Sequence, residues 1–128
     1  MTSLDEITVV LKRSPDDPEQ FSREYQETIG NVLAASWADG VKTMPRIFTM
    51  DAVDAVGGYT GEFIAIAKSL GPATIAALGG WLAGRNGRKV RIKVDGIEVE
   101  ASSMKQLDEA LKRVEQVKRD NEPKRIHE

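Results

Sequence analysis

The chain has 128 residues, of which 41% are apolar and 30% charged, and its formal net charge at pH 7 is −2. A chain of this length and composition can bury one core, so we expect a globular protein rather than a disordered one. The absence of cysteine excludes disulfides, thiolate metal sites and thiol catalysis, and it fits a reducing compartment. The acidic start, Met1–Glu6, lacks the basic-then-apolar order of a secretory signal, so we expect a cytoplasmic protein.

The first forty residues predict a strand followed by a helix. Residues Leu4–Lys12 are apolar on both faces, which predicts an internal strand covered on each side. Asp17 and Pro18 fit the N-cap and the first position of a helix that ends before Gly40. Apolar residues recur through it at steps of three and four and predict one buried face: Phe21, Tyr25, Ile29, Val32, Leu33 and Trp37.

Residues 41–61 give the weakest signals. A short strand at Arg46–Met50, after Pro45, is our prediction for this segment, and we expect a long surface loop around it. The glycine-rich run Gly57–Gly61 predicts a flexible connection.

Residues 62–84 are rich in alanine, glycine and bulky apolar side chains, which predicts a mostly buried helix. Gly71 and Pro72 should divide it into two helices or bend it, because proline removes a donor and clashes with the preceding turn. A membrane span over residues 63–84 is the competing interpretation, and Lys68 together with the Gly-Pro pair weighs against it.

The clearest local signal is a hairpin with Asp95 and Gly96 at its two-residue turn, since Asp-Gly supplies the positive φ angles that such turns need. The implied register places three apolar pairs on one face: Val94 with Ile97, Ile92 with Val99, and Val90 with Ala101. On the other face it opposes unlike charges: Lys93 with Glu98, and Arg91 with Glu100.

A capping box of Ser103 and Gln106 then predicts a C-terminal amphipathic helix, followed by a disordered charged tail at residues 120–128. The narrow apolar stripe of this helix is formed by Met104, Leu107, Leu111, Val114 and either Val117 or Lys118. Together these elements predict one α+β domain over residues 1–119. Its antiparallel sheet has three to four strands, the N-terminal strand plus the C-terminal hairpin among them, packed against helices.

No group of residues matches a known catalytic or metal site. The only histidine, His127, lies in the charged tail, where a general base would lack fixed geometry. Asp51, Asp54 and Glu62 could together hold a divalent cation, but calcium-loop spacing is absent and we read them as solvated acids. The run Gly57–Gly61 lacks the lysine and hydroxyl of a phosphate-binding loop. We therefore predict that the protein is not an enzyme and holds no metal or cofactor.

A cluster of five cations lies at residues 85–93, around the turn before the hairpin: Arg85, Arg88, Lys89, Arg91 and Lys93. Nucleic acid or anionic lipid would be attracted to it. The cross-strand partners of two of these cations, the lack of interleaved aromatic residues and the acidic sequence pI weigh against nucleic acid. Trp81 beside this turn is interpreted first as a core anchor and second as an interface residue.

The segment Gly79–Arg85, the basic stretch Arg88–Val94, the strand Ile97–Ala101 and the helix from Ser103 resemble the effector-associated constant component family, small proteins encoded with bacterial conflict systems. The resemblance covers residues 71–118. It implies a non-catalytic adaptor that works beside a separate effector or signalling protein.

We therefore expect a protein–protein interaction module whose contact surface is formed by Trp81, Arg85, Arg88 and Lys89. The partner is a protein, and a homo-oligomer is left open. The alternative is a small nucleic-acid-binding module that uses the basic turn at residues 85–93.

Overall fold

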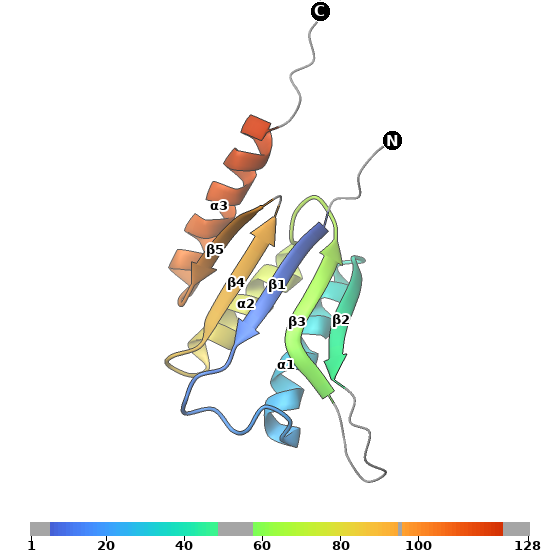
Figure 1. The fold of residues 1–128 in the computed structure, drawn as a ribbon, viewed down its shortest axis with the longest axis vertical. Coiled ribbons are helices and arrows are strands. Elements are labelled where there is room, and N and C mark those ends of the chain that lie inside the picture. The colour runs from blue at the N-terminus through green and yellow to red at the C-terminus, as the bar shows by residue number, and fades with distance from the viewer. Residues whose placement is uncertain (1–5, 49–57, 95, 122–128) are drawn as a thin grey trace, which may run out of the picture.

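The computed structural model describes residues 6–48, 58–94 and 96–121, which form one five-stranded antiparallel sheet and three helices. The elements follow one another in this order: β1 (Glu6–Lys12), α1 (Arg23–Ala38), β2 (Lys42–Phe48), β3 (Gly58–Ile66), α2 (Pro72–Ala83), β4 (Lys89–Val94), β5 (Ile97–Ala101) and α3 (Met104–Asn121). The strand order across the sheet is β2-β3-β1-β4-β5, and every neighbouring pair is antiparallel (Figure 1). The α+β class is confirmed, but the predicted three to four strands are too few.

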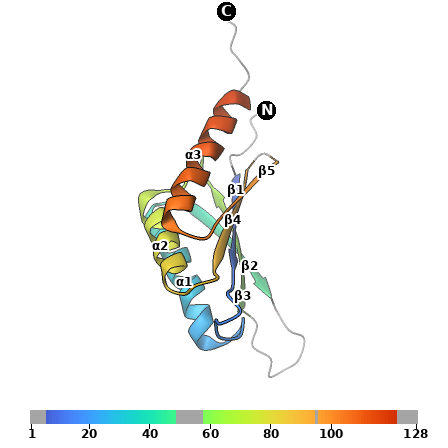
Figure 2. The same ribbon diagram turned by 90° about the vertical axis from the view of Figure 1, so that its left-hand side faces the viewer.

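The first six elements follow the order βαββαβ, with β3 between β2 and β1 and with β4 on the far side of β1. This is the split βαβ, ferredoxin-like topology, to which β5 and α3 are added. Figure 2 shows that the three helices lie on the same side of the sheet. The fold is therefore a two-layer sandwich of helices on a sheet.

The central strand β1 is internal, as predicted, but it is covered on one side only by the described elements. Ile7, Val9 and Leu11 are buried against the helices, whereas Thr8 and Val10 on the opposite face are half-buried. The reason is topological: both crossover connections place their helices on the same face, and no described helix reaches the other.

The hairpin is confirmed in its register, with Val94 opposite Ile97 and Val90 opposite Ala101. Gly96 has a φ of +82°, the left-handed conformation that the turn requires.

The predicted helix over residues 62–84 is wrong in its first part. Residues Gly58–Ile66 form β3, with Phe63 and Ala65 buried and their neighbours less so. Only after Gly71 does the chain become helical, with Pro72 at the first position of α2. The predicted boundary at Gly71 and Pro72 is confirmed, but the prediction of two helices or one bent helix is wrong, because a strand precedes the boundary. The flexible connection proposed for Gly57–Gly61 is wrong from Gly58 onward for the same reason.

The second strand exists but lies earlier than predicted, at Lys42–Phe48 instead of Arg46–Met50. It is an edge strand with Pro45 in it and an irregularity between Pro45 and Ile47. Both features hinder further strand pairing at a sheet edge.

Helix α1 begins at Arg23 rather than at Pro18. Its N-cap is Ser22, whose Oγ accepts a hydrogen bond from the Tyr25 N–H at 3.2 Å. The predicted cap, Asp17, is instead buried in a different contact described below. Trp37 is 49% exposed and is not part of the buried face of α1.

Helix α3 begins at the predicted position, and Ser103 Oγ accepts from the Gln106 N–H at 3.2 Å. The Gln106 amide oxygen accepts from the Ser102 N–H at 2.8 Å, one residue before the capping-box position. The helix extends to Asn121, two residues into the predicted tail. The remainder of that tail, with His127, lies outside the described residues.

Candidate functional site

Two cations of the basic turn, Arg85 and Arg88, are bound by a buried aspartate. Arg88 donates from Nη2 to Asp17 Oδ1 at 2.7 Å and from Nε to Oδ2 at 3.0 Å. Arg85 Nε lies 3.2 Å from the same Oδ1, and the Ser14 N–H donates to Oδ2 at 2.8 Å. The Asp17 side chain has no solvent-exposed area. This cluster joins the segment before α1 to the turn between α2 and β4.

The Asp17 carboxyl remains ionised at neutral pH. Burial raises its pKa, but the hydrogen bonds from Arg88 and Ser14 and the charges of Arg88 and Arg85 outweigh burial and hold the pKa below its usual range. Nearby, burial raises the pKa of Tyr25 to about 12, and the Asp17 charge adds to the effect. Neither group is poised to exchange a proton near pH 7.

Trp81 is only 5% exposed and is a core residue. Its indole N–H donates to Thr28 Oγ1 at 3.2 Å, and its carbonyl accepts from Arg88 Nη1 at 2.8 Å. The Arg88 guanidinium carbon lies 4.8 Å from a Trp81 ring centroid, a cation–π contact. Of the predicted contact surface, Trp81 and Arg88 are therefore buried in the fold, and only Arg85 and Lys89 have substantial exposure.

Two cations of the hairpin, Lys89 and Arg91, are also in ion pairs on the side of the sheet away from the helices. Arg91 lies 3.1 Å from carboxylate oxygens of both Glu98 and Glu100, and Lys12 lies 3.5 Å from Glu100. Partial burial raises the pKa of Glu100, but the Arg91 hydrogen bond and the charges of Lys12, Lys89 and Arg91 lower it by more. The predicted partner of Glu98, Lys93, is opposite it in register, yet Arg91 takes the carboxylate.

A contact that the sequence analysis missed holds the start of α2. The N-cap of α2 is Gly71, which has no side chain to cap the helix. Asp39 at the end of α1 supplies the cap: its carboxylate accepts from the N–H groups of Ala73 and Thr74 at 3.1 and 2.8 Å and from the Thr74 hydroxyl at 2.7 Å. The Thr74 hydroxyl bond holds the pKa of Asp39 below its usual range. In the sequence, a glycine at the start of a helix indicates that another residue must cap it, but it could not identify Asp39 as that residue.

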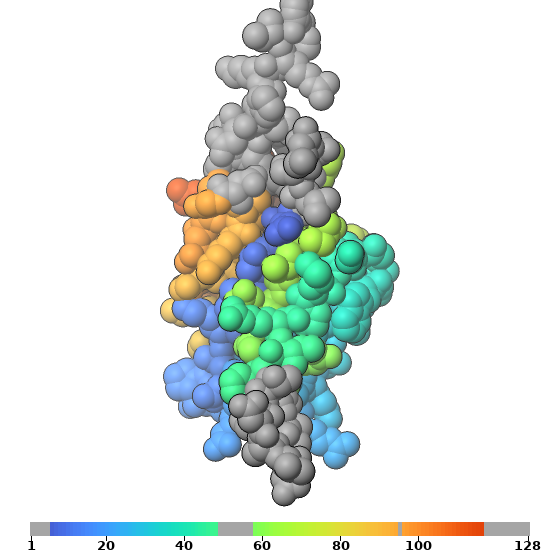
Figure 3. All heavy atoms as spheres, turned by 45° about the vertical axis from the view of Figure 1, so that its right-hand side comes forward, coloured from blue at the N-terminus to red at the C-terminus, as the bar shows by residue number. Residues whose placement is uncertain are grey.

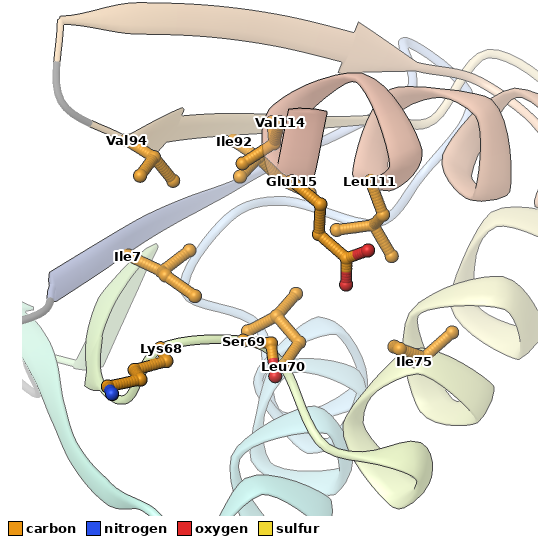
Figure 4. A pocket seen from close by; sticks show the side chains of 10 residues that line it. All are labelled: Ile7, Lys68, Ser69, Leu70, Ile75, Ile92, Val94, Leu111, Val114 and Glu115. Carbon is orange, nitrogen blue, oxygen red and sulfur yellow. The ribbon is translucent and has the colours of Figure 1, made fainter. Parts of the chain in front are cut away.

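A small apolar pocket lies between α3 and the sheet, with a volume of about 40 Å³. It is lined mostly by aliphatic side chains: Ile7, Leu70, Ile75, Ile92, Val94, Leu111 and Val114 (Figure 4). Lys68, Ser69 and Glu115 complete it, and Glu115 extends from α3 toward Leu70 and Ile75 (Figure 4). The volume is about that of three waters.

The described residues contain no group of three or more histidine, cysteine, aspartate or glutamate side chains that could hold a metal ion. Of the three acids considered for a cation, Asp51 and Asp54 lie outside the described residues, and Glu62 on β3 lies 3.7 Å from Arg46 in an ion pair. No described helix is both long enough and apolar enough to cross a membrane. Residues 63–84 were considered as a membrane span, and the part of this segment up to Ile66 belongs to strand β3.

The sheet face away from the helices, here called the open face, carries apolar side chains at its centre. Ile64 on β3 lies between Thr8 on β1 and Met44 on β2. Val10 and Ile66 lie two residues further along in opposite directions, where their cross-strand partners are Glu62 and Glu6. We call Thr8, Val10, Met44, Ile64 and Ile66 the apolar patch. Met44 is 44% exposed and the other four are half-buried. In Figure 3, atoms of β1, β3 and β2 lie side by side at the surface with no described helix in front of them.

Comparison with protein-family models, curated proteins and solved structures found no match to this chain.

Proposed function

We propose that the protein is a non-catalytic interaction module that binds another protein through its open face. The observation that carries this proposal is the apolar patch, which combines an exposed methionine with isoleucine and valine side chains on a surface that no described helix covers. Exposed apolar side chains gathered in one place, with charged residues around them, are typical of protein-binding surfaces. This proposal moves the contact surface from Trp81 and the basic turn to the opposite side of the sheet.

Several acidic and basic side chains of the described residues are used in contacts within the fold, which supports a non-catalytic role. Asp17 is in ion pairs with Arg85 and Arg88, and Asp39 caps α2. Side chains held in this way stabilise the fold and leave no described acid or base directed at a substrate.

Two observations weigh against the nucleic-acid alternative. Arg85 and Arg88 are bound to Asp17, and Arg91 is bound to two glutamates, so much of the basic turn's charge is already neutralised. Four-stranded sheets that bind RNA stack bases on aromatic side chains of the sheet. The central strands here present Thr8, Val10 and aliphatic residues of β3 instead.

The biological setting of the proposal comes from the resemblance to the effector-associated constant component family. On that basis the module is an adaptor in the cytoplasm that serves a separate effector or signalling protein of a bacterial defence system. A topology of this kind supports many functions, so the fold by itself adds nothing to this part of the proposal.

The proposal is tested by affinity capture from the native host with a pair of matched variants. Met44 on the open face and Met104 on α3 are 44% and 41% exposed, so Met44→Asp and Met104→Asp introduce the same change at similar exposure on different surfaces. We expect a stoichiometric protein partner that survives nuclease and high salt, is lost with Met44→Asp and is retained with Met104→Asp. Capture that is unaffected by Met44→Asp, or that disappears with nuclease, contradicts the proposal.

A further inference from the structure

We propose that the open face binds an amphipathic helix of the partner protein, with acidic residues on both flanks of its apolar stripe. This inference rests on the proposed function and specifies the partner's chemistry. It follows from the width of the apolar patch, from the charges on either side of it, and from the features of the fold that disfavour other occupants.

The dimensions of the patch fit one helix. Its core occupies the two neighbouring strands β3 and β1, with Met44 extending it onto β2. Strands lie about 4.8 Å apart, so two strands are about 10 Å wide, which is close to the diameter of an α-helix with its side chains. Because β1 and β3 are antiparallel and Thr8 is opposite Ile64, Val10 and Ile66 lie four residue steps apart along the strands, or about 13 Å. Side chains at positions i, i+3, i+4 and i+7 of a helix cover about this length.

Two lysines that have no ion pair among the described residues lie on opposite sides of the apolar patch. Lys42 on β2 is opposite Ile66, and Lys93 on β4 is opposite Thr8. Both are exposed, and neither has an ion pair within the described parts of the chain. Three strand spacings, about 14 Å, separate β2 from β4, so the two lysines would lie beside a helix about 10 Å wide.

The other charges of the open face leave it positive. Six cations point to this side: Lys12, Lys42, Arg46, Lys89, Arg91 and Lys93. Four glutamates do so as well: Glu6, Glu62, Glu98 and Glu100. Three of these glutamates are already in ion pairs within the face. A helix flanked by carboxylates therefore complements the surface, whereas one flanked by lysines is repelled.

The same features disfavour a second copy as the occupant. Two copies packed face to face would bring two net-positive surfaces together. Pairing through the free edge of β2 is hindered by Pro45 and the neighbouring irregularity.

The inference is tested with two synthetic helical peptides of about 18 residues, long enough to form a helix on binding. They share one leucine stripe at i, i+3, i+4 and i+7 and differ only in having glutamate or lysine at the flanking positions. Binding to the full chain is measured by fluorescence anisotropy and mapped by amide chemical-shift changes. We expect the acidic peptide to bind at least about tenfold more tightly at low salt, with shifts on β1 and β3 and with a preference that declines as salt is added.

Charge reversal at the two lysines provides the sharpest control. Lys42→Glu combined with Lys93→Glu should invert the preference, so that the lysine-flanked peptide binds better, and Lys105→Glu on α3 should change nothing. All three lysines are exposed, so the variants should fold, as circular dichroism will verify.

Equal affinity for both peptides, no binding of the acidic peptide, or shifts away from β1 and β3 would each overturn the helix inference. So would a concentration-dependent dimer that Met44→Asp abolishes. If the peptides fail while Met44→Asp still abolishes partner capture, the proposed function stands and only the partner's chemistry is wrong. If capture does not depend on Met44, the proposed function itself fails.

Discussion

Replacement of the buried carboxylate, Asp17→Ala, should be among the most destabilising single changes in this chain. The substitution leaves the Arg88 guanidinium buried, with its side chain only 8% exposed, and removes its three contacts of 2.7 to 3.2 Å with the carboxylate. The Ser14 N–H and Arg85 lose the same partner.

The magnitude follows from the donors left without a partner. Arg88 keeps its bond to the Trp81 carbonyl, but its Nε and Nη2 groups become unsatisfied, at about 1–3 kcal/mol for each buried donor. Removal of one member of a buried ion pair costs about 3–5 kcal/mol in other proteins, which agrees with that sum. Since a domain of this size is stable by about 5–15 kcal/mol, the variant should unfold at a much lower urea concentration.

The assay is urea unfolding followed by circular dichroism and tryptophan fluorescence, since Trp81 lies against Arg88. The matched control is Asp16→Ala, which changes an exposed side chain one residue away. It should change the free energy of unfolding by less than about 0.5 kcal/mol. The double variant Asp17→Ala with Arg88→Met should recover part of the loss, because it removes the unpaired charge as well. A cost below about 1 kcal/mol for Asp17→Ala, or no recovery in the double variant, would refute the reasoning.

Four further predictions concern stability. Tyr25→Phe should leave the free energy of unfolding unchanged or raise it slightly in urea titrations, because the buried hydroxyl has no hydrogen-bond partner among the described residues; a loss above about 1 kcal/mol would reveal a missed partner. Asp39→Ala should lower the melting temperature at neutral pH. Because the folded-state pKa of Asp39 is depressed, its contribution is present above the usual value of 3.8 and is lost as pH falls through the folded pKa, so wild type and variant should converge in acid. Gly30→Ala should stabilise helix α1 by about 0.5–1 kcal/mol, since nothing lies within 4 Å of the added methyl. Gly61→Ala should destabilise the fold, because φ is +98° and the new Cβ would lie 2.8 Å from the Leu11 carbonyl oxygen. The two glycine substitutions are compared by thermal unfolding, and equal effects would contradict this account.

The elements that the sequence predicted correctly are those whose signals are local. Prediction of the hairpin required only the alternation of apolar and charged residues around Asp95 and Gly96, from which the register followed. Helix α3 needed only a cap at Ser103 and a stripe at helical spacing. The beginning of α2 needed only Pro72.

Segments without a local signature were misread. Residues Gly58–Ile66 are apolar and include alanine, a composition that fits a buried helix as well as a strand between two others. Their state is decided by pairing with β1 and β2, which are distant in sequence. Asp17 before Pro18 had the pattern of a helix cap, but Arg88, 71 residues away, offers the carboxylate a stronger partner than a helix N-terminus does.

For the candidate site too, the sequence predicts what depends on local signals, and the tertiary structure decides what depends on distant contacts. The sequence determined that the chain would be one α+β fold, that its reactive side chains were few, and that cations would gather near the hairpin. Only the tertiary structure decided that Trp81 and Arg88 are buried, because Asp17 and Thr28 reach them from other elements. It also decided that all three helices pack on one face, because both crossover connections lie on the same side of the sheet. That choice leaves the second apolar face of β1 and β3 uncovered by any described helix, and no periodicity within a single strand can reveal on which side its neighbours will lie.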